Sequence, residues 1–374
     1  MEKRRSFIKK SSLALAATAL PLNYIACMGN TKQKAVPQEN KEPVKKLGVA
    51  LLGLGNYATN LLAPALRQTE HIELRGIVTG SPEKIPQWQE KYGIKDENVY
   101  NYETLPDIAN NPEIDVVYIV VPTFLHMKYS VMAANAGKHV FCEKPMAMDV
   151  AECQAIIEAC NKNKVKLAIG YRMQHEKNTK TIMQWADSKP YGKIQSVQTE
   201  AGFKIGAGGG WRLDGAKGGG AIYDMGVYPI NATRYSTGLE PIAVTARHET
   251  KRPGLFINGA PEITYFDLEF PKGITAKGRV TYNDNINYLK VDCEDGGYEL
   301  SPFQSYNGVQ GKTSDGKPLA PCDCYQQAIQ MDDDAQAIIK GTAMLCPGEE
   351  GLNDIKVVRA IFESAAHGSK KVMV

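Results

Sequence analysis

Residues 47–58 read LGVALLGLGNYA. An uninterrupted apolar run ends at Gly53, and the pattern Gly-x-Gly-x-x-Ala begins there and is completed by Gly55 and Ala58. A buried strand that runs into such a turn and then into a helix is typical of the first unit of a dinucleotide-binding fold. The turn presents backbone N–H groups to a pyrophosphate. An ordinary strand-to-helix turn is the alternative. The expected contacts are Gly53, Leu54, Gly55, Asn56 and Tyr57.

The chain up to residue 170 alternates apolar segments with helical ones. We expect further strands at 74–78, 116–121, 138–141 and 166–169, and helices after the glycine turn, around Trp88 and Tyr92, and at 125–136 and 149–162. Because the apolar segments are continuous, both faces of their sheet should be covered, as in parallel sheets with crossover helices. Residues 47–170 are therefore predicted to form a doubly wound, NAD(P)-binding Rossmann domain.

The end of the second strand distinguishes NADP from NAD. A carboxylate there would bind the adenosine ribose hydroxyls, but residues 78–84 read VTGSPEK, with no acid at the strand tip. Thr79, Gly80 and Ser81 supply hydrogen bonds, and Lys84 supplies a charge that suits a 2′-phosphate. We therefore predict NADP, with NAD as the alternative; a solvated surface lysine is the other interpretation of Lys84.

Two motifs follow later strands. Pro122, Thr123 and His126 come after the strand at 116–121, and Glu143-Lys144 comes after the strand at 138–141. The carboxyl ends of parallel strands form the ligand-binding edge of a sheet. A lysine beside a nicotinamide site can lower the pKa of a substrate hydroxyl or of a neighbouring phenol. We predict that both motifs contact the cofactor; a surface turn is the alternative for the Glu-Lys pair.

Composition and charge exclude several classes of protein. The chain has 374 residues, of which 43% are hydrophobic and 23% charged, as in globular enzymes. The net charge of +3 is unevenly distributed along the chain, because residues 1–46 carry a net +7 and the remainder a net −4. A nucleic-acid partner is not expected, since the folded part lacks the basic excess that such binding needs. The scattered histidines and the cysteine spacings match no metal site.

The first thirty residues have the features of an export signal. Arg4-Arg5 and further basic residues precede the apolar run 13–22, a pattern that resembles the twin-arginine signal for folded proteins. Cys27 lies in a segment that loosely resembles a lipidation site, so cleavage near residue 19 and lipid attachment at Cys27 remain alternatives. We predict an exported, periplasmic protein with a polar linker at 31–46, attached to a membrane only if Cys27 is lipidated.

The second part of the chain has the patterns of an α/β domain. Strand-like segments occur at 193–204, 241–250, 262–270, 274–283, 286–293 and 296–301, and helical ones at 221–236, 325–340 and 352–366. The glycine run at 206–210 precedes no helix, so we expect a flexible loop there, with a lid as one role.

Motifs along the chain resemble the Gfo/Idh/MocA oxidoreductases, most closely their glucose–fructose oxidoreductase branch. The matching segments read GLG at 53–55, TGS at 79–81, CEKPMA at 142–147, IGYR at 169–172, WR at 211–212, GGG at 218–220, DMGVY at 224–228, TRY at 233–235 and PGEEG at 347–351. This resemblance implies a Rossmann domain and a second domain, residues 171–374, with a large, mostly antiparallel, open-faced sheet that binds substrate and another subunit. It also implies that helix 352–366 returns toward the Rossmann domain, and that the protein is a homodimer or homotetramer.

The resemblance assigns the chemistry to Lys144, Asp224 and Tyr228. The wider family commonly has His as the acid/base at the position of Tyr228, and the glucose–fructose oxidoreductase branch has Tyr. A free phenol has a pKa near ~10, so an adjacent Lys144 ammonium is needed to favour the phenolate. Asp224, four residues earlier, would accept a hydrogen bond from a substrate hydroxyl. His126, Arg172, Trp211 and Arg212 are expected to line the nucleotide or sugar site.

These expectations combine into a sugar oxidoreductase. It would oxidise a pyranose C1 hydroxyl, or another sugar hydroxyl, with tightly bound NADP and return the hydride to a second carbonyl. Two alternatives remain: an NAD-dependent glycoside hydrolase of the same fold, and a catalytically silent protein that senses a sugar or a nucleotide.

Overall fold

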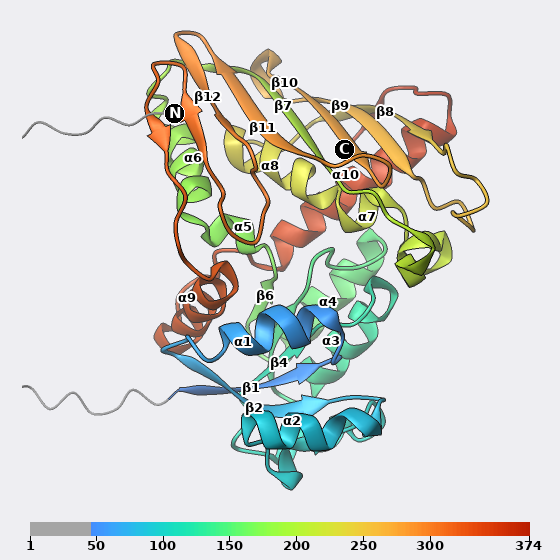
Figure 1. The fold of residues 1–374 in the computed structure, drawn as a ribbon, viewed down its shortest axis with the longest axis vertical. Helices are drawn as coiled ribbons and strands as arrows, with labels where there is room; N and C mark the ends of the chain where they lie inside the picture. Colours follow the sequence, from blue (N-terminus) through green and yellow to red (C-terminus); the bar gives the residue numbers. More distant parts are fainter. Residues whose placement is uncertain (1–45) are drawn as a thin grey trace, which may run out of the picture. The chain divides into compact units, whose positions relative to one another are not determined.

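The computed structural model describes residues 46–374 (Figure 1). The predicted export signal, Cys27 and all of the predicted linker except Lys46 lie outside these residues. Within this part of the chain, every helix is either too short or too polar to cross a membrane.

The first sheet is parallel, as the sequence predicted. Its strands have the order β3-β2-β1-β4-β5-β6, which is the order of doubly wound dinucleotide-binding domains. The strands are β1 (Leu47–Leu52), β2 (Ile72–Val78), β3 (Val99–Tyr100), β4 (Val116–Ile119), β5 (His139–Cys142) and β6 (Leu167–Ile169). The helices between them are α1 (Ala63–Ala65), α2 (Ile85–Tyr92), α3 (His126–Asn135) and α4 (Val150–Lys162).

Both faces of this sheet are covered, which explains its continuous apolar strands. Ala50 and Leu52 of β1 face one way and belong to the same core as residues of α3 and α4. Val49 and Leu51 face the other way, into a second core with α1, α2 and a helix from near the end of the chain, α9 (Gln326–Lys340). The region that stabilises the nucleotide domain is therefore not one contiguous segment, and a boundary drawn after residue 170 leaves α9 out.

The second sheet is mostly antiparallel. Its order is β14-β13-β12-β11-β7-β10-β9-β8-β15, and β7 pairs with β10 in parallel. Its strands are β7 (Ile194–Gly202), β8 (Ala243–Glu249), β9 (Ile263–Glu269), β10 (Thr275–Thr281), β11 (Ile286–Cys293), β12 (Gly296–Leu300), β13 (Gly311–Thr313), β14 (Pro318–Leu319) and β15 (Val372–Met373). The other helices are α5 (Arg172–His175), α6 (Lys177–Ser188), α7 (Ala221–Asp224), α8 (Val227–Thr237) and α10 (Gly348–Ala366). Helix α8 packs on β7, β10 and β11, and α10 contacts both β8 and α4.

Two local predictions are refined by the structure. The helical segment expected at 221–236 is two helices, α7 and α8, separated by a turn at Met225 and Gly226, and a Cβ at Gly226 would lie 2.3 Å from the carbonyl oxygen of Ile222. The glycine run at 206–210, where a flexible loop was expected, leads into 3-10 turns that Ala207–Leu213 form and that bend at Gly210, whose φ is +59°. Both turns shape the wall of the cleft described below.

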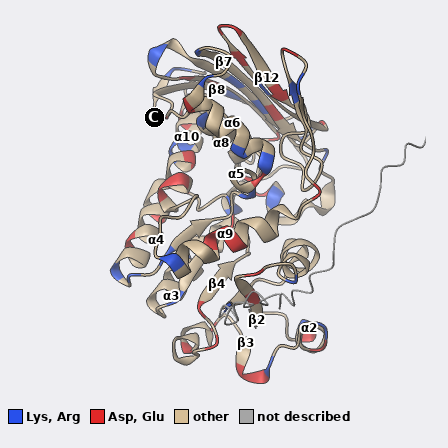
Figure 2. Cartoon of the chain, turned by 90° about the vertical axis from the view of Figure 1, so that its left-hand side faces the viewer, with Lys and Arg blue, Asp and Glu red and all other residues tan. Residues whose placement is uncertain are grey.

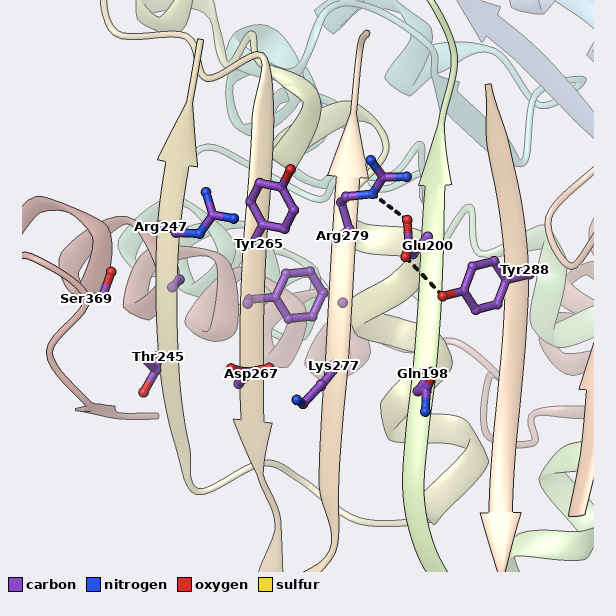
Figure 3. A pocket seen from close by; sticks show the side chains of 13 residues that line it. Gln198, Glu200, Thr245, Arg247, Tyr265, Asp267, Lys277, Arg279, Tyr288 and Ser369 are labelled. Carbon is purple, nitrogen blue, oxygen red and sulfur yellow. Dashed lines mark hydrogen bonds and ion pairs between the residues drawn. The ribbon is translucent and has the colours of Figure 1, made fainter. Parts of the chain in front are cut away.

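The face of the second sheet that is turned away from the helices is polar and hollowed, as Figure 3 shows. Glu200 accepts hydrogen bonds from Arg279 and from the Tyr288 hydroxyl, and the Arg247 guanidinium lies 3.7 Å from the centre of the Tyr265 ring. Homo-oligomer formation through this open face stays a prediction. Figure 2 shows Lys and Arg interspersed with Asp and Glu over the helices of the described chain, so neither sign of charge is confined to one element.

Candidate active site

The glycine turn after β1 is shaped to admit a phosphate. Gly53 has a φ of +99°, and a Cβ there would lie 2.7 Å from the Val120 carbonyl oxygen, so a side chain is excluded. At Gly55 a Cβ would meet no protein atom within 4 Å. Ala58 is fully buried, which lets the following helix pack closely on the sheet. Open space at Gly55 beside backbone N–H groups suits a dinucleotide pyrophosphate.

The helix that follows the turn is irregular. Ala58–Leu62 form a π turn, and α1 contains Pro64. Proline has no N–H to continue the regular bonding pattern, which accounts for the wide turn before it. Asn60 and Leu61 on this turn line the cleft, although the sequence analysis did not select them.

The segment after β2 approaches the same turn. The Lys84 ammonium donates a 2.9 Å hydrogen bond to the carbonyl oxygen of Leu54, between the two motif glycines. The Ser81 N–H donates to the Thr79 hydroxyl oxygen, and the Tyr102 ring closes over Gly80. Lys84 thus carries its charge beside the phosphate turn, where a 2′-phosphate on the neighbouring ribose would be stabilised.

Two adjoining hollows meet at the predicted catalytic residues. The first, about 580 Å³, runs along the carboxyl ends of the strands and is lined by the glycine turn, the segment 120–123 and Glu143. The second, about 1000 Å³, is lined by the segment 202–209, Asn287 and the loop 304–307. The residues common to both are Leu61, Lys144, Arg212, Asp224, Tyr228 and Tyr306. A group in each hollow would therefore face the same side chains.

Lys144 and Tyr228 lie close together, as predicted. The Lys144 ammonium is 4.5 Å from the centre of the Tyr228 ring and donates a 2.8 Å hydrogen bond to the backbone carbonyl of Asp224. Burial disfavours the charged lysine, but Tyr228, Asp224 and Glu143 outweigh it and raise the pKa of Lys144. The ammonium is therefore held charged beside the phenol.

Asp224 lines both hollows, and most of its interactions are with the protein, so its predicted contact with a substrate hydroxyl stays a prediction. Its Oδ2 accepts hydrogen bonds from Arg212 Nε at 2.9 Å and from the Tyr282 hydroxyl at 2.7 Å, and its Oδ1 lies 3.6 Å from Lys144 Nζ. Burial opposes ionisation, but Lys144 and Arg212 lower the pKa of Asp224 to about 2. It is also on α7, not on the helix of Tyr228. Asp224 anchors Lys144 and Arg212.

Glu143 is buried beneath the cleft. It accepts a 2.8 Å hydrogen bond from the Tyr118 hydroxyl and one of 3.2 Å from the Lys144 N–H. Burial raises its pKa although Lys144 opposes that shift. The carboxylate fixes the backbone that carries Lys144.

Five other predicted residues line the first hollow. Pro122 and Thr123 line the first hollow, as does Trp211, and Arg212 stacks on Trp211 with its guanidinium carbon 4.7 Å from the ring centre. His126 also borders this hollow, but both of its ring nitrogens lie 2.8 Å from backbone carbonyls, of Pro145 and Val121. Its hydrogen-bonding capacity is therefore used within the protein.

Arg172 was expected to line the site, but it lines neither hollow. It is 1% exposed and lies behind the wall, with its guanidinium carbon 5.4 Å from the centre of the Tyr228 ring.

The sequence analysis missed Tyr306, Tyr282 and Asn287. Tyr306 comes from the loop after β12, and its ring centre is 6.0 Å from that of Tyr57, so two distant loops meet over the cleft. Tyr282 follows β10 and binds Asp224. None of the three stands in a motif or at a predicted strand end of the parallel sheet, so only the fold could bring them to this place.

A dinucleotide-binding sheet edge that meets an ammonium and a phenol defines the class of an NAD(P)-dependent oxidoreductase. Residues 47–171 match the oxidoreductase family with an NAD-binding Rossmann fold, and residues 179–299 match the GFO/IDH/MocA C-terminal domain. The chain belongs to the Gfo/Idh/MocA family.

Similar proteins include several that act on sugars. The solved structure of an aldose-aldose oxidoreductase from Caulobacter crescentus, complexed with glycerol, is 39% identical, covers 88% of this chain and 100% of its own, and has a TM-score of 0.84. The NADP(+) D-xylose 1-dehydrogenase of Haloarcula marismortui is 26% identical over 88% of this chain and 93% of its own length. A levoglucosan dehydrogenase in complex with NADH and levoglucosan shares the fold at 20% identity, 88% and 100% coverage, and a TM-score of 0.76.

Proposed function

We propose that this chain is an NADP-dependent sugar oxidoreductase that oxidises one aldose at C1 and reduces a second sugar carbonyl with a nucleotide that stays bound. The observation that carries the proposal is the wall shared by the two hollows, where Lys144 and Tyr228 face both. The aldose-aldose oxidoreductase and the NADP(+) xylose dehydrogenase similar to this chain support the substrate class and the cofactor.

The first hollow holds the cofactor in this proposal. The turn at 53–57 would hold the pyrophosphate, and the segment 120–123 and Glu143 the nicotinamide end. Lys84 and the segment 79–81 do not line this hollow, but Lys84 lies against the turn at Leu54, from where they would hold the ribose phosphate. The bound nucleotide supplies a hydride acceptor and, once reduced, a hydride donor. The second hollow takes the sugar.

Within the cleft the chain itself moves one proton. Tyr228 takes the proton of the C1 hydroxyl as the hydride leaves C1, and the first aldose becomes a lactone. Lys144, held by Asp224, stabilises the negative charge on the phenol oxygen. When the second sugar accepts the hydride at its carbonyl carbon, Tyr228 returns the proton to the new alkoxide, so the two half-reactions release no net proton.

Export fits this cycle. We propose that the basic, apolar segment 1–30 directs the folded protein to the periplasm, where an enzyme that retains its nucleotide does not depend on a free pool.

The test uses protein purified without added nucleotide. Incubated with a single aldose, it should form alditol and an equal amount of lactone, which water hydrolyses to aldonic acid, and denaturation should release about one NADP(H) per chain, identified by absorbance and mass. Turnover only with added NADP would contradict retention and leave a dissociating dehydrogenase. Release of aglycone from an aryl glycoside, without oxidised and reduced sugar products, would favour the glycoside hydrolase instead.

A further inference from the structure

Arg172 occupies an unusual position for a charged side chain. It is the first residue of α5, directly after the parallel sheet, and it is 1% exposed. Its guanidinium carbon lies 4.5 Å from the centre of the Tyr306 ring and 5.4 Å from that of Tyr228. It therefore contacts, from behind, two of the tyrosines that face both hollows.

The partners of Arg172 are neutral. Nη1 donates to the Ser305 carbonyl at 3.0 Å and to the Gln326 side-chain oxygen, and Nη2 donates to the Gln304 carbonyl. Nε has no hydrogen-bond partner in the described structure. Among residues 46–374, no carboxylate lies within ion-pair distance of this guanidinium. A buried cation without a counter-charge is costly, which calls for a compensating interaction.

The aromatic rings beside the guanidinium supply that interaction. The guanidinium of Arg172 lies over the rings of Tyr306 and Tyr228, whose faces attract a cation, and its charge acts to lower the pKa of the Glu143 carboxyl, which burial raises. Tyr228 thus has two cations near its ring, Lys144 and Arg172. An attraction between Arg172 and Tyr228 grows when the phenol loses its proton, so it favours the state that acts as a base.

The same guanidinium also fixes a loop. The carbonyls of Gln304 and Ser305 that accept its hydrogen bonds directly precede Tyr306, which lies on the wall of the second hollow. A planar fork with several donors can hold two successive carbonyls, whereas an ammonium can match its charge but not this geometry.

We propose that Arg172 is a positioning residue with two separable effects: its charge stabilises the deprotonated form of Tyr228, and its fork holds the loop 304–306 that contacts the sugar. This inference rests on the proposed role of Tyr228 as the acid/base. It goes beyond that role because it adds a second cation and links the base to substrate binding.

The experiment compares Arg172→Met with Arg172→Lys. Rates of aldose oxidation are followed in the holoenzyme from pH 5 to pH 10. In Arg172→Met, which removes the charge, the pH midpoint of the rise in kcat should move up by about one unit and kcat at pH 7 should fall ~10-fold. In Arg172→Lys, which keeps the charge and loses the fork, that midpoint should stay within about half a unit of wild type while KM for the aldose rises ~10-fold.

The outcomes separate this inference from the proposed function. A fall in kcat by the same factor at every pH in Arg172→Met, with no shift of the midpoint, would show a purely structural role and overturn the charge effect. If Arg172→Met loses bound nucleotide because it does not fold, Arg172→Lys decides, and an unchanged KM in that variant overturns the inference. A wild-type protein that binds NADP but oxidises no aldose overturns the proposed function, and this inference with it.

Discussion

The first hollow of the active-site cleft and the hollow on the open face of the second sheet have nearly equal volumes, but they differ in how far their charged side chains are buried. The cleft at the parallel sheet measures about 580 Å³ and the hollow on the open sheet face about 590 Å³, and each contains arginine, acid and tyrosine. In the cleft the side chains of Lys144 and Asp224 are 13% and 11% exposed, whereas Arg247 on the open face is 56% exposed. Volume does not distinguish these hollows, but the burial of charge does.

Tyr228 in the cleft and Tyr288 on the open face have neighbours of opposite charge. Tyr228 in the cleft lies beside the cations of Lys144 and Arg172. Tyr288 on the open face donates its hydroxyl hydrogen bond to Glu200 at 2.9 Å, and burial together with that carboxylate raises the pKa of Tyr288 to about 12. Neighbouring cations favour a phenolate and a neighbouring carboxylate disfavours it. Of these two tyrosines, Tyr228 alone has cations beside its ring, which is the arrangement that the proposed base requires.

The largest expected effect tests this difference directly. Tyr228→Phe removes the hydroxyl that takes the proton, and general acid–base catalysis of this kind contributes about 10²–10⁴-fold, so kcat for aldose oxidation should fall ~10³-fold. Tyr288→Phe is the matched control and should leave kcat within about twofold. The amounts of oxidised and reduced sugar formed per chain give both rates, and the nucleotide that each variant retains checks the fold. If both variants kept wild-type kcat, Tyr228 would not be the acid/base.

The second prediction concerns the two motif glycines. Gly55→Val adds a side chain where its Cβ meets no protein atom, so the free energy of unfolding of the nucleotide-free protein should change by less than ~0.5 kcal/mol. The same side chain occupies the space predicted for the pyrophosphate, and the Kd for NADP should rise ~100-fold.

Gly53→Ala provides the contrast for that pair. Its φ of +99° and the 2.7 Å approach to Val120 should make this variant less stable by more than ~1 kcal/mol. Chemical unfolding and calorimetric titration of NADP measure the two effects. An unchanged Kd in Gly55→Val would place the nucleotide elsewhere.

The sequence predicted the two domains' fold class well because both depend on local pattern. The strand 47–52 and the turn at Gly53 required only the order of apolar residues and glycines, and the parallel sheet followed. The proximity of Lys144 to Tyr228 rested on the family resemblance and agrees with the structure. By contrast, α9 packs on the first sheet from far along the chain, a contact that local periodicity cannot indicate.

The sequence analysis missed the protein partners of the polar residues in the site. It did not show that Arg212, Tyr282 and Lys144 surround Asp224, and Tyr282 stands in no motif. Arg172 was expected in the cleft, but the carbonyls of a loop more than a hundred residues later hold it behind the wall. Such partners depend on tertiary contacts, which a single sequence does not reveal.

The smallest expected effect is a loss of stability, and it concerns the carboxylates of Asp224 in the cleft and of Glu200 on the open sheet face. The pKa of Asp224 is about 2 in the fold and ~3.9 when unfolded, so its ionised form stabilises the protein above pH ~4 and this stabilisation is lost as the pH falls toward 2. By linkage it amounts to about 2–3 kcal/mol at pH 7. Asp224→Asn should lose that amount at pH 7 and roughly 1 kcal/mol less at pH 3. Glu200→Gln, which breaks a partly exposed pair on the open face, should cost less than ~1 kcal/mol.

Urea unfolding of each variant at the two pH values measures these differences. Equal losses for Asp224→Asn and Glu200→Gln would remove the distinction between the hollows, because a carboxylate held by Lys144 and Arg212 would then be worth no more than one on the open face. A loss in Asp224→Asn that does not shrink between pH 7 and pH 3 would show that the amide breaks the site by its shape, since the contribution of a lowered pKa must decline as the carboxylate of the wild type takes up its proton.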